Sequence, residues 1–430
     1  MEKVEKFQKF NPWSRHELLE EFPFHSPMQV IQSLSGFKAP LVSYPKLSVE
    51  QKIQLIEKIC LLIEQKQEKI IQSESLAQGL PRQFVRDHGV KWVLRYIQSY
   101  LVELQSDPSM TFLPVGLVCL LPSWQLSFRQ IAESIIPALI TGNCLILKSD
   151  PRSRSSAYLW RDILNEAELP EGVVQVVDGD DELGLFLMKH PAFKSVCYSG
   201  TTRFMERVWS SLPLFRKNFS FFLSTKNAMA ILPETSDELI AQNLRSCWIG
   251  YGELKQNIHR IFCTEKDFDR VQSVIATEIQ KIQWDQQSME SSHYGVRVVQ
   301  TDQNMIESLK SEVGQFLFED KQSDLKPIVY MNMPHCSELQ QDPASLITVN
   351  SVKYVHEMAK WINNGYLGYA ALVLGPTDKA SALGRKLEVS RVWINDWMSD
   401  NHPREVIHGL KLSCKGDVIN ELQSKLWQYR

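Results

Sequence analysis

From about residue 114 to residue 212 the chain alternates between short apolar runs and longer segments whose apolar residues recur at helical spacing. The apolar runs lie at 115–122, 143–149, 173–179 and 195–200, and the helical segments at 127–142, 155–169, 181–190 and 201–212. Strands this apolar are buried on both faces, and strands joined through helices run parallel with right-handed crossovers. The alternation therefore predicts an α/β fold with a doubly wound parallel sheet, whose ligand edge is formed by the carboxyl ends of the strands.

A second α/β unit follows, from about residue 223 to residue 395. It contains the strand-like runs AMAILP, RIFCTE, IVYMNM, SLITVN, ALVLG and RVWIND, with helical segments between them. Ahead of the first sheet, residues 48–79 carry apolar side chains at helical spacing with charges on the opposite face. A chain of 430 residues is long enough to form these separate cores.

Charge and cysteine usage limit the classes of partner and compartment. The net charge is -3 and the basic residues are scattered, so we predict neither a nucleic-acid nor a membrane partner. A small-molecule ligand or another protein is the expected partner. The 8 cysteines lie far apart without a C-x-x-C pair, which is typical of reduced, buried thiols. With no apolar run of about 18 residues and no apolar signal segment, we predict a cytoplasmic protein.

Several ordered sequence blocks between about Ser48 and Gly416 resemble those of the aldehyde dehydrogenase superfamily. The blocks are PVGLVCLLPSWQ, ALITGNCLILKSD, LPEGVVQVVDG, CYSGTT, FLSTK and HGLKLSCKG. The resemblance implies an aldehyde dehydrogenase-like fold, with a Rossmann-like dinucleotide-binding domain at 111–222 and the counterpart of the family's catalytic domain at 223–395. It also implies that an N-terminal helical segment, 1–110, packs on the cofactor domain and that a C-terminal segment, 396–430, returns to it.

The resemblance also implies where the family's nucleophile should lie. In the family a cysteine thiolate attacks the aldehyde, hydride passes to a nicotinamide, and a glutamate then activates water. Gly252 and Arg260 align with the glycine and arginine that flank this cysteine, which places the nucleophile position at Lys255. A register shift of one residue would place it at Gln256, and neither residue carries a thiol.

Two further positions of the family's chemistry depart from the pattern. The general-base position carries Phe222, whose ring cannot take a proton from water. The oxyanion asparagine is replaced by Gln125, which keeps an amide donor but moves it out by one methylene. Loss of nucleophile and base together removes the covalent route of the family, because such residues act as a unit.

The positions that the resemblance assigns to the cofactor are mixed. Those that match are Trp124, Lys148, Gly200 and Thr201, and those that depart are Pro151, Met205 and Gln340 or Gln341. An acidic residue is replaced at 151, although Asp150 is adjacent, and a glycine is replaced at 205. We expect an NAD or NADP site whose adenosine half persists and whose nicotinamide half is dismantled, with weak or absent binding.

Lys255 admits two interpretations. A desolvated lysine in an aldehyde tunnel can form a Schiff base. The simpler interpretation, which we favour, is a solvated loop residue followed by the polar Gln256 and Asn257. Cys247 and Cys263 are expected to pack in the core, and Glu253 has no thioester to hydrolyse.

No replacement chemistry is evident elsewhere in the sequence. The histidines His259, His402 and His408 do not fall at metal-ligand spacing, so no metal site is predicted. Phe222 ends an aromatic run with Phe219 and Phe221 that suits a buried strand.

Two hypotheses about function remain. The favoured one is a divergent aldehyde dehydrogenase-like pseudoenzyme without aldehyde-oxidising activity, which retains at most residual binding of a dinucleotide or carbonyl ligand. The alternative is an NAD(P)-dependent oxidoreductase acting on an aldehyde or related carbonyl by a cysteine-independent route. The nine residues Gln105–Leu113 are too few for the family's oligomerisation hairpin, so we expect a monomer or dimer instead of the family-type tetramer.

Overall fold

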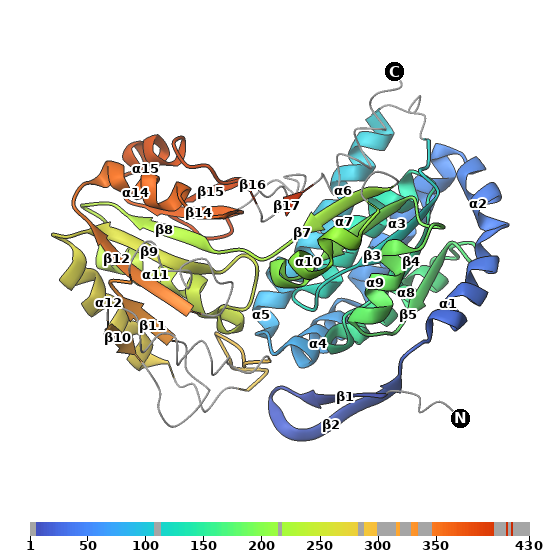
Figure 1. Cartoon of the computed structure of the whole chain (residues 1–430), viewed down its shortest axis with the longest axis horizontal. Coiled ribbons are helices and arrows are strands. Elements are labelled where there is room, and N and C mark those ends of the chain that lie inside the picture. The colour runs from blue at the N-terminus through green and yellow to red at the C-terminus, as the bar shows by residue number, and fades with distance from the viewer. Residues whose placement is uncertain are drawn as a thin grey trace.

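The structure of the protein, a computed structural model, describes residues 6–106, 113–213, 217–282, 288–298, 315–318, 328–333, 346–399, 410–411 and 414–415. The predictions that concern Gln340, Gln341, His402 and His408 lie outside the described residues. So does most of the connection across residues 107–112, and the absence of a hairpin there stays a prediction. Figure 1 shows the two sheets in two neighbouring halves of the molecule.

The first sheet has six strands in the order β17-β7-β6-β3-β4-β5. Their bounds are β3 Leu117–Leu121, β4 Cys144–Lys148, β5 Val174–Val177, β6 Ser195–Ser199, β7 Asn218–Phe222 and β17 Cys414–Lys415. The five strands β3 to β7 are parallel, and every residue of β3 and β4 is buried. Strand β17 joins antiparallel to β7, so the chain returns to this sheet near its end. The predicted doubly wound parallel sheet is confirmed.

The crossovers of this sheet are the predicted helices. They are α7 Ser127–Ile140, α8 Arg154–Glu166, α9 Asp181–Lys189 and α10 Thr202–Val208, with short 3-10 turns η4 Pro151–Ser153 and η5 Trp209–Ser211. Side chains cap two of their N-termini, because Asp180 accepts from the N–H of Leu183 and Thr201 accepts from that of Phe204. Helix α7 is buried along its whole length, which places it between the first sheet and the N-terminal helices.

The second sheet has seven strands in the order β10-β11-β12-β9-β8-β14-β15. Their bounds are β8 Asn227–Ile231, β9 Ile258–Thr264, β10 Gln315–Phe318, β11 Ile328–Met331, β12 Leu346–Val352, β14 Ala370–Leu374 and β15 Arg391–Ile394. All six predicted strand runs are present, and only β10 is antiparallel to its neighbour. The helices between them are α11 Asp237–Trp248, α12 Phe268–Lys281, α14 Val355–Asn363 and α15 Thr377–Gly384, with the turn η6 at Ile249–Gly252. A small pair joins β13 Leu367–Gly368 to β16 Leu410–Lys411.

The N-terminal segment starts with a β-hairpin that the sequence did not lead us to expect. Strands β1 Lys6–Asn11 and β2 Ser14–Pro23 pair antiparallel and lie below the first sheet in Figure 1. The buried side chains of β1 are Lys9 and Asn11, so hydrophobic alternation gives no signal there.

The remainder of the N-terminal segment is helical. The helices and turns are α1 Pro27–Ser33, η1 Leu34–Phe37, α2 Pro40–Ser43, η2 Tyr44–Lys46, α3 Val49–Gln65, α4 Gln67–Gln78, α5 Arg82–Phe84, η3 Val85–Val90 and α6 Lys91–Ser106. Ser48 and Gln51 form a capping box that starts α3. Among the described residues, no helix has both the length and the apolar character needed to cross a membrane.

Candidate functional site

The candidate site lies at the carboxyl ends of β6 and β7, the edge that the fold predicts for a ligand. Ser199 and Phe222 are register partners at the ends of these two strands. From the second unit, the loop between η6 and β9 reaches this edge and inserts Lys255. The structure thus brings the predicted nucleophile position and general-base position together.

The ammonium of Lys255 has three hydrogen-bond acceptors. Its Nζ atom donates to Oγ of Ser199 at 2.9 Å and to the carbonyl oxygen of Gly200 at 3.3 Å. It also donates to the carbonyl oxygen of Phe222, and it lies 4.2 Å from the centre of the Phe222 ring. Three acceptors and an aromatic face suit an ammonium ion, whose three hydrogens all point to acceptors. An amine whose nitrogen only donates presents no lone pair to a carbonyl carbon.

The expectation of a solvated Lys255 is wrong, because the residue is only 6% exposed. Its carbonyl oxygen accepts from Oγ1 of Thr225 at 2.6 Å and from Nδ2 of Asn227 at 2.9 Å. The polar neighbours that suggested a solvated loop also point inward: Asn257 donates to the carbonyls of Ser246 and Ile249. The loop is therefore an ordered, buried part of the site.

A tight turn precedes this loop. Gly250 and Tyr251 have φ of 59° and 58°, and Gly252 has 73°. Left-handed backbone favours glycine, and of the three residues of this turn only Tyr251 carries a side chain. This turn reverses the chain after α11 so that the loop from Glu253 to Asn257 faces the first sheet.

Phe222 packs within the site, and Gln125 forms hydrogen bonds there. The Phe222 ring is buried and lies 5.2 Å from the ring of Tyr369, and the strand with Phe219 and Phe221 is buried as predicted. Gln125 donates from Nε2 to the carbonyl oxygen of Glu253, while its Oε1 accepts from Oγ of Ser123 at 3.3 Å. The amide at the oxyanion position is thus bonded to the loop that carries Lys255.

The loop from Ser199 to Thr201, which holds the predicted cofactor residues Gly200 and Thr201, is bonded to the protein itself. The N–H of Gly200 donates to the carbonyl of Phe222 at 3.1 Å, and that of Thr202 donates to Oγ of Ser224 at 3.1 Å. The Tyr198 phenol lies beside the backbone of Thr201. A Cβ added to Gly200 would lie 1.9 Å from this phenol oxygen, so Tyr198 fills the space beside the glycine.

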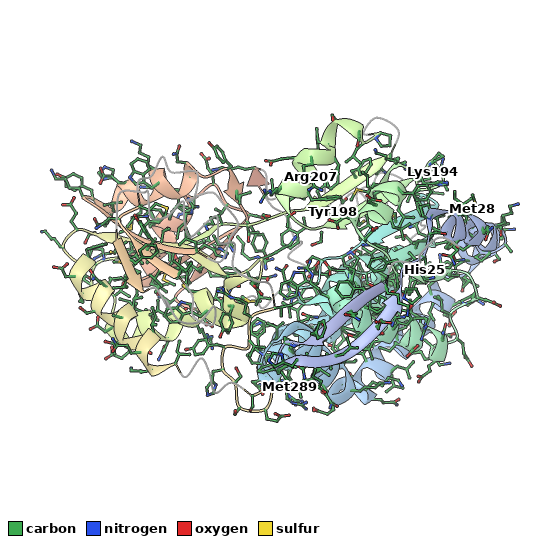
Figure 2. All side chains as sticks on the ribbon, turned by 60° about the horizontal axis from the view of Figure 1, so that its bottom comes forward. His25, Met28, Lys194, Tyr198, Arg207 and Met289 are labelled. Atoms are coloured by element: carbon green, nitrogen blue, oxygen red, sulfur yellow. The ribbon has the colours of Figure 1, made fainter. Side chains whose placement is uncertain are left out.

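Tyr198 lies near the junction of the two halves of the molecule in Figure 2. Its ring stacks on Phe204 of α10 with centroids 5.6 Å apart. Burial raises the pKa of the Tyr198 phenol above its ordinary range, and the carboxylate of Asp181 adds to this shift. The phenol is therefore a neutral group packed over the loop.

The remaining predicted cofactor residues lie at the ends of β3 and β4. Trp124 and Lys148 are both buried, and the Lys148 ammonium has no hydrogen-bond partner within the described parts of the chain. Burial lowers the pKa of Lys148, and the carboxylates of Asp150 and Asp181 oppose that shift. Arg152, which the sequence did not single out, donates two hydrogen bonds to Asp150 and lies 5.2 Å above the Trp124 ring.

Burial raises the pKa of Asp150, but the hydrogen bonds and charge of Arg152 outweigh it and hold this pKa below the ordinary value. Asp150 is therefore an ionised carboxylate that already accepts hydrogen bonds from the Arg152 side chain. Lys148 is the predicted cofactor residue that keeps free donors.

An ion pair inside α7 was missed by the sequence analysis. Arg129 donates from Nε to Oε1 of Glu133 at 2.9 Å, and both side chains are about 5% exposed. Glu133 lines a cavity of about 30 Å³ together with Tyr198, Ser199 and Phe222. Burial raises the pKa of Glu133, whereas the charge of Arg129 and, more weakly, that of Lys255 lower it. Two opposite charges four residues apart in an apolar helix were the available signal.

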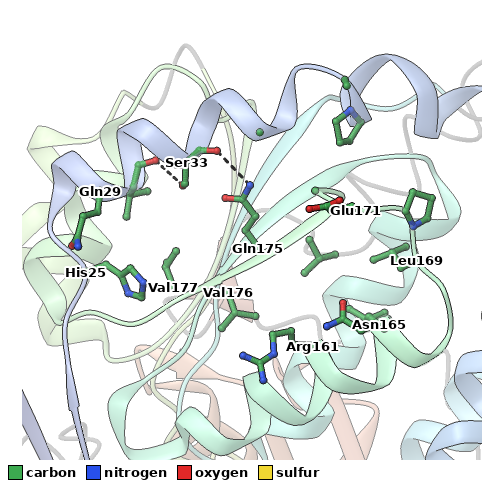
Figure 3. Close-up of a pocket in the computed structure, with 18 residues that line it drawn as sticks. His25, Gln29, Ser33, Arg161, Asn165, Leu169, Glu171, Gln175, Val176 and Val177 are labelled. Carbon is green, nitrogen blue, oxygen red and sulfur yellow. Dashed lines mark hydrogen bonds between the residues drawn. The ribbon is translucent and has the colours of Figure 1, made fainter.

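A larger cavity of about 730 Å³ lies between α1 and the edge strand β5, as Figure 3 shows. Its polar side chains already hold the two elements together: Gln175 donates to the carbonyl of Ser33 at 3.3 Å, and Nδ1 of His25 accepts from the N–H of Asp178 at 3.0 Å. The cavity walls carry one positive side chain, Arg161, and one negative side chain, Glu171. None of the predicted site residues lines this cavity.

The described residues offer neither a reactive cysteine to replace the family's nucleophile nor a set of metal ligands. Cys247 and Cys263 are buried as predicted, and burial raises the pKa of each thiol to about 12, so neither forms a thiolate near neutral pH. In the described residues, no cluster of histidine, cysteine and carboxylate side chains is arranged to hold a metal ion.

Fold and site together define an α/β protein with two large sheets, in which the strand ends of the parallel sheet face a loop from the second sheet. The sequence profile described as "Aldehyde dehydrogenase family" matches residues 1–428. The chain belongs to the aldehyde dehydrogenase family.

Relatives and solved structures agree with this assignment. The chain is 25% identical to a putative aldehyde dehydrogenase, FUS7, of Gibberella fujikuroi over 319 residues, which cover 70% of this chain and 68% of that protein. It is 27% identical to the Homo sapiens 2-aminomuconic semialdehyde dehydrogenase over 235 residues, 51% of this chain and 48% of that protein.

The fold is similar to that of aldehyde dehydrogenase C of Pseudomonas syringae, a mutant solved with NAD+ and octanal. The TM-score is 0.86 at 18% identity, covering 97% of this chain and 90% of that one. An NADP-dependent glyceraldehyde-3-phosphate dehydrogenase of Bacillus halodurans, complexed with NADP, gives a TM-score of 0.84 at 20% identity, covering 97% and 93%.

Proposed function

We propose that this protein is a member of the aldehyde dehydrogenase family that does not oxidise aldehydes. One observation carries the proposal: the loop Ser199 to Thr201 is engaged on both sides by the protein's own side chains. The Lys255 ammonium donates to Ser199 Oγ and to the Gly200 carbonyl, and the Tyr198 phenol oxygen fills the space where a Cβ on Gly200 would lie. A dinucleotide bound at this loop would have to displace these contacts before any hydride could be transferred.

The side chains at the reacting positions support the same conclusion. Lys255 stands at the position that the family resemblance gives to the nucleophile, and its nitrogen donates to three acceptors. Phe222 stands at the position of the general base and packs against Tyr369. A phenyl ring neither accepts a proton nor orients a water molecule, so this pair offers neither covalent capture nor hydrolysis.

Residual dinucleotide binding is the second part of the proposal. Lys148 is buried beside Asp150 at the end of β4 with its ammonium unbonded among the described residues, and such a donor suits a ribose or phosphate oxygen. This feature also favours the alternative function, an NAD(P)-dependent oxidoreductase acting on an aldehyde or related carbonyl without a cysteine. Solved members of the fold named above hold NAD+ or NADP.

Two measurements on the purified protein test the proposal. Calorimetric titrations of NAD+, NADH, NADP+ and NADPH should give weak or no binding, and thermal shifts should be small, since a ligand at about 100 times its Kd would stabilise the fold by about 2.7 kcal/mol. Incubation of aliphatic aldehydes with NAD+ or NADP+ should give no reduced cofactor above the uncatalysed rate.

A rate above background would contradict the proposal if Lys255→Met abolished it. Formation of alcohol from aldehyde and NADH or NADPH would instead establish the cysteine-independent alternative. We further propose that the protein is a monomer or dimer, which light scattering of the purified chain measures directly; a tetramer would contradict this part alone.

A further inference from the structure

A cavity of about 270 Å³ lies where α6 begins, beside α7 and the chain that follows β15. Its walls are formed by Asp87, His88, Lys91, Trp92, Arg95, Arg129, Met398 and Ser399. Burial and the charge of Arg129 lower the pKa of His88 to about 4, so this imidazole is neutral near pH 7. Three cations and one carboxylate therefore line the cavity, which gives it a positive potential.

Arg129 is the buried cation at this cavity. Its Nε donates to Glu133 at 2.9 Å and its Nη1 donates to the carbonyl of His88 at 3.3 Å. Its Nη2 has no hydrogen-bond partner among the residues that the structure describes. The guanidinium is held in place by the Trp92 ring, whose centre lies 3.8 Å from Cζ. A rigid, desolvated guanidinium with free donors matches the planar geometry of a carboxylate.

Glu133 accepts from the Nε of this guanidinium, and the other charged residues that line the cavity do not compete for its remaining donors. Asp87 is bonded to Lys91 at 2.9 Å and to Gln83 at 2.7 Å, so it is already satisfied. Arg95 forms no ion pair with any described residue and lies exposed at the rim. Glu133 faces the smaller cavity near Lys255, so the Arg129–Glu133 pair separates the two cavities.

We propose that this cavity binds a small organic carboxylate through Arg129. Met398 lines the cavity as an apolar side chain beside the cations, which favours an organic acid over an inorganic anion. Arg95 and Lys91 at the rim would attract the anion before it reaches Arg129. Such a site would serve an oxidising or a non-oxidising protein alike, so it stands independently of the function proposed above.

The binding test uses three probes that separate the sources of affinity. Benzoate carries the carboxylate on a flat carbon frame, benzamide has nearly the same shape without the charge, and inorganic phosphate has the charge without the frame. Calorimetry on the full chain should show saturable binding of benzoate at millimolar concentration. Benzamide and phosphate should each bind at least tenfold more weakly.

A matched pair of variants places the probe in the cavity without disturbing the core. Ser399 is exposed on the cavity wall, so Ser399→Glu adds a carboxylate that competes for Arg129, whereas Ser399→Gln adds the same bulk without charge. We expect Ser399→Glu to weaken benzoate at least tenfold and Ser399→Gln to change it less than threefold. Equal loss in both variants would overturn the site, because bulk and not charge would then be responsible.

A second pair tests Arg129 itself. The double variant Arg129→Met with Glu133→Gln removes both buried charges together, so neither is left unpaired. It should lose benzoate binding by at least tenfold, while Glu133→Gln alone keeps Arg129 and should retain it. Unchanged benzoate affinity in the folded double variant would overturn the proposal, as would equal affinity for benzoate and benzamide, or for benzoate and phosphate, in the wild type.

Discussion

The Nζ atom of Lys255 lies 2.9 Å from Oγ of Ser199, so a side chain from the loop before β9 is bonded to the last residue of β6. This contact joins the two sheets across the site where a family ligand would lie. The Gly200 and Phe222 carbonyls also accept from the same ammonium. Lys255 thus links the two halves of the molecule through hydrogen bonds.

Removal of the Lys255 ammonium should lower the stability of the protein. Lys255→Met keeps the length of the side chain but leaves the acceptors of Ser199, Gly200 and Phe222, the last of them buried, without the ammonium. An unsatisfied buried polar group costs about 1–3 kcal/mol, so we expect the free energy of unfolding to fall by about that amount. Urea unfolding measures it, with Lys266→Met at an exposed position as the control, where a change within about 0.5 kcal/mol is expected. A Lys255→Met variant as stable as the wild type would show that the ammonium contributes nothing net.

The family's chemistry should return in part when its two groups are restored. Lys255→Cys with Phe222→Glu supplies a thiol and a carboxylate at adjacent positions near β6 and β7. We expect trace oxidation of an aliphatic aldehyde, measured as NADH formation and blocked by iodoacetamide. Lys255→Ser with Phe222→Glu is the matched control without a thiol. No gain in the cysteine variant, in a preparation that demonstrably binds NAD+, would mean that the loop closes the site further than these two residues explain.

Acid should destabilise the protein through His259. Burial, with the charge of Lys226, lowers the pKa of His259 to about 3, and its Nδ1 has no hydrogen-bond partner within the described residues. The unfolded chain, with a histidine pKa of about 6.5, binds a proton that the folded chain refuses between pH 6.5 and about 3. Stability is therefore present above pH 6.5 and is lost as the pH falls toward 3.

The size of this effect can be measured by unfolding the wild type and His259→Gln at several pH values. From pH 7.5 to pH 5, we expect His259 to account for about 2 kcal/mol of the lost free energy of unfolding. Glutamine can still donate to the Gly252 carbonyl, which lies 2.9 Å from Nε2, but it cannot take up a proton. His16→Gln on the exposed hairpin is the control and should leave the pH dependence unchanged. An identical slope in His259→Gln would refute the assignment.

The sheets could be predicted because their strands are buried on both faces. Runs such as those of β3 and β4 are apolar at every position, and helices separate them at regular intervals. The hairpin β1–β2 could not be found in this way, since the buried positions of β1 are Lys9 and Asn11. Its register places Phe7 opposite Phe22, with the ring centroids 5.7 Å apart.

The position of the candidate site was predicted, but the burial of its loop was not. The family resemblance assigned Phe222 and Lys255 to one site, and the structure brings them together, with Ser199, which was not singled out, beside them. The polar run after Lys255 suggested solvent exposure, because a sequence does not show whether an asparagine bonds to water or to a buried carbonyl. Asn257 bonds to buried carbonyls, and its neighbours are buried with it.

Dinucleotide affinity should increase when the Tyr198 hydroxyl is removed. Tyr198→Phe removes the oxygen that lies beside Gly200, while the ring keeps its stacking on Phe204. We expect NAD+ to bind several-fold more tightly to this variant, because the space beside Gly200, at the start of α10, is then open to a phosphate. Tyr158→Phe is the control, since its hydroxyl is bonded at 2.6 Å to Asp178 in the same half of the molecule but away from the loop. Calorimetry with NAD+ on both variants decides the question: equal affinities would show that Tyr198 does not limit binding, and the block would then lie with Lys255.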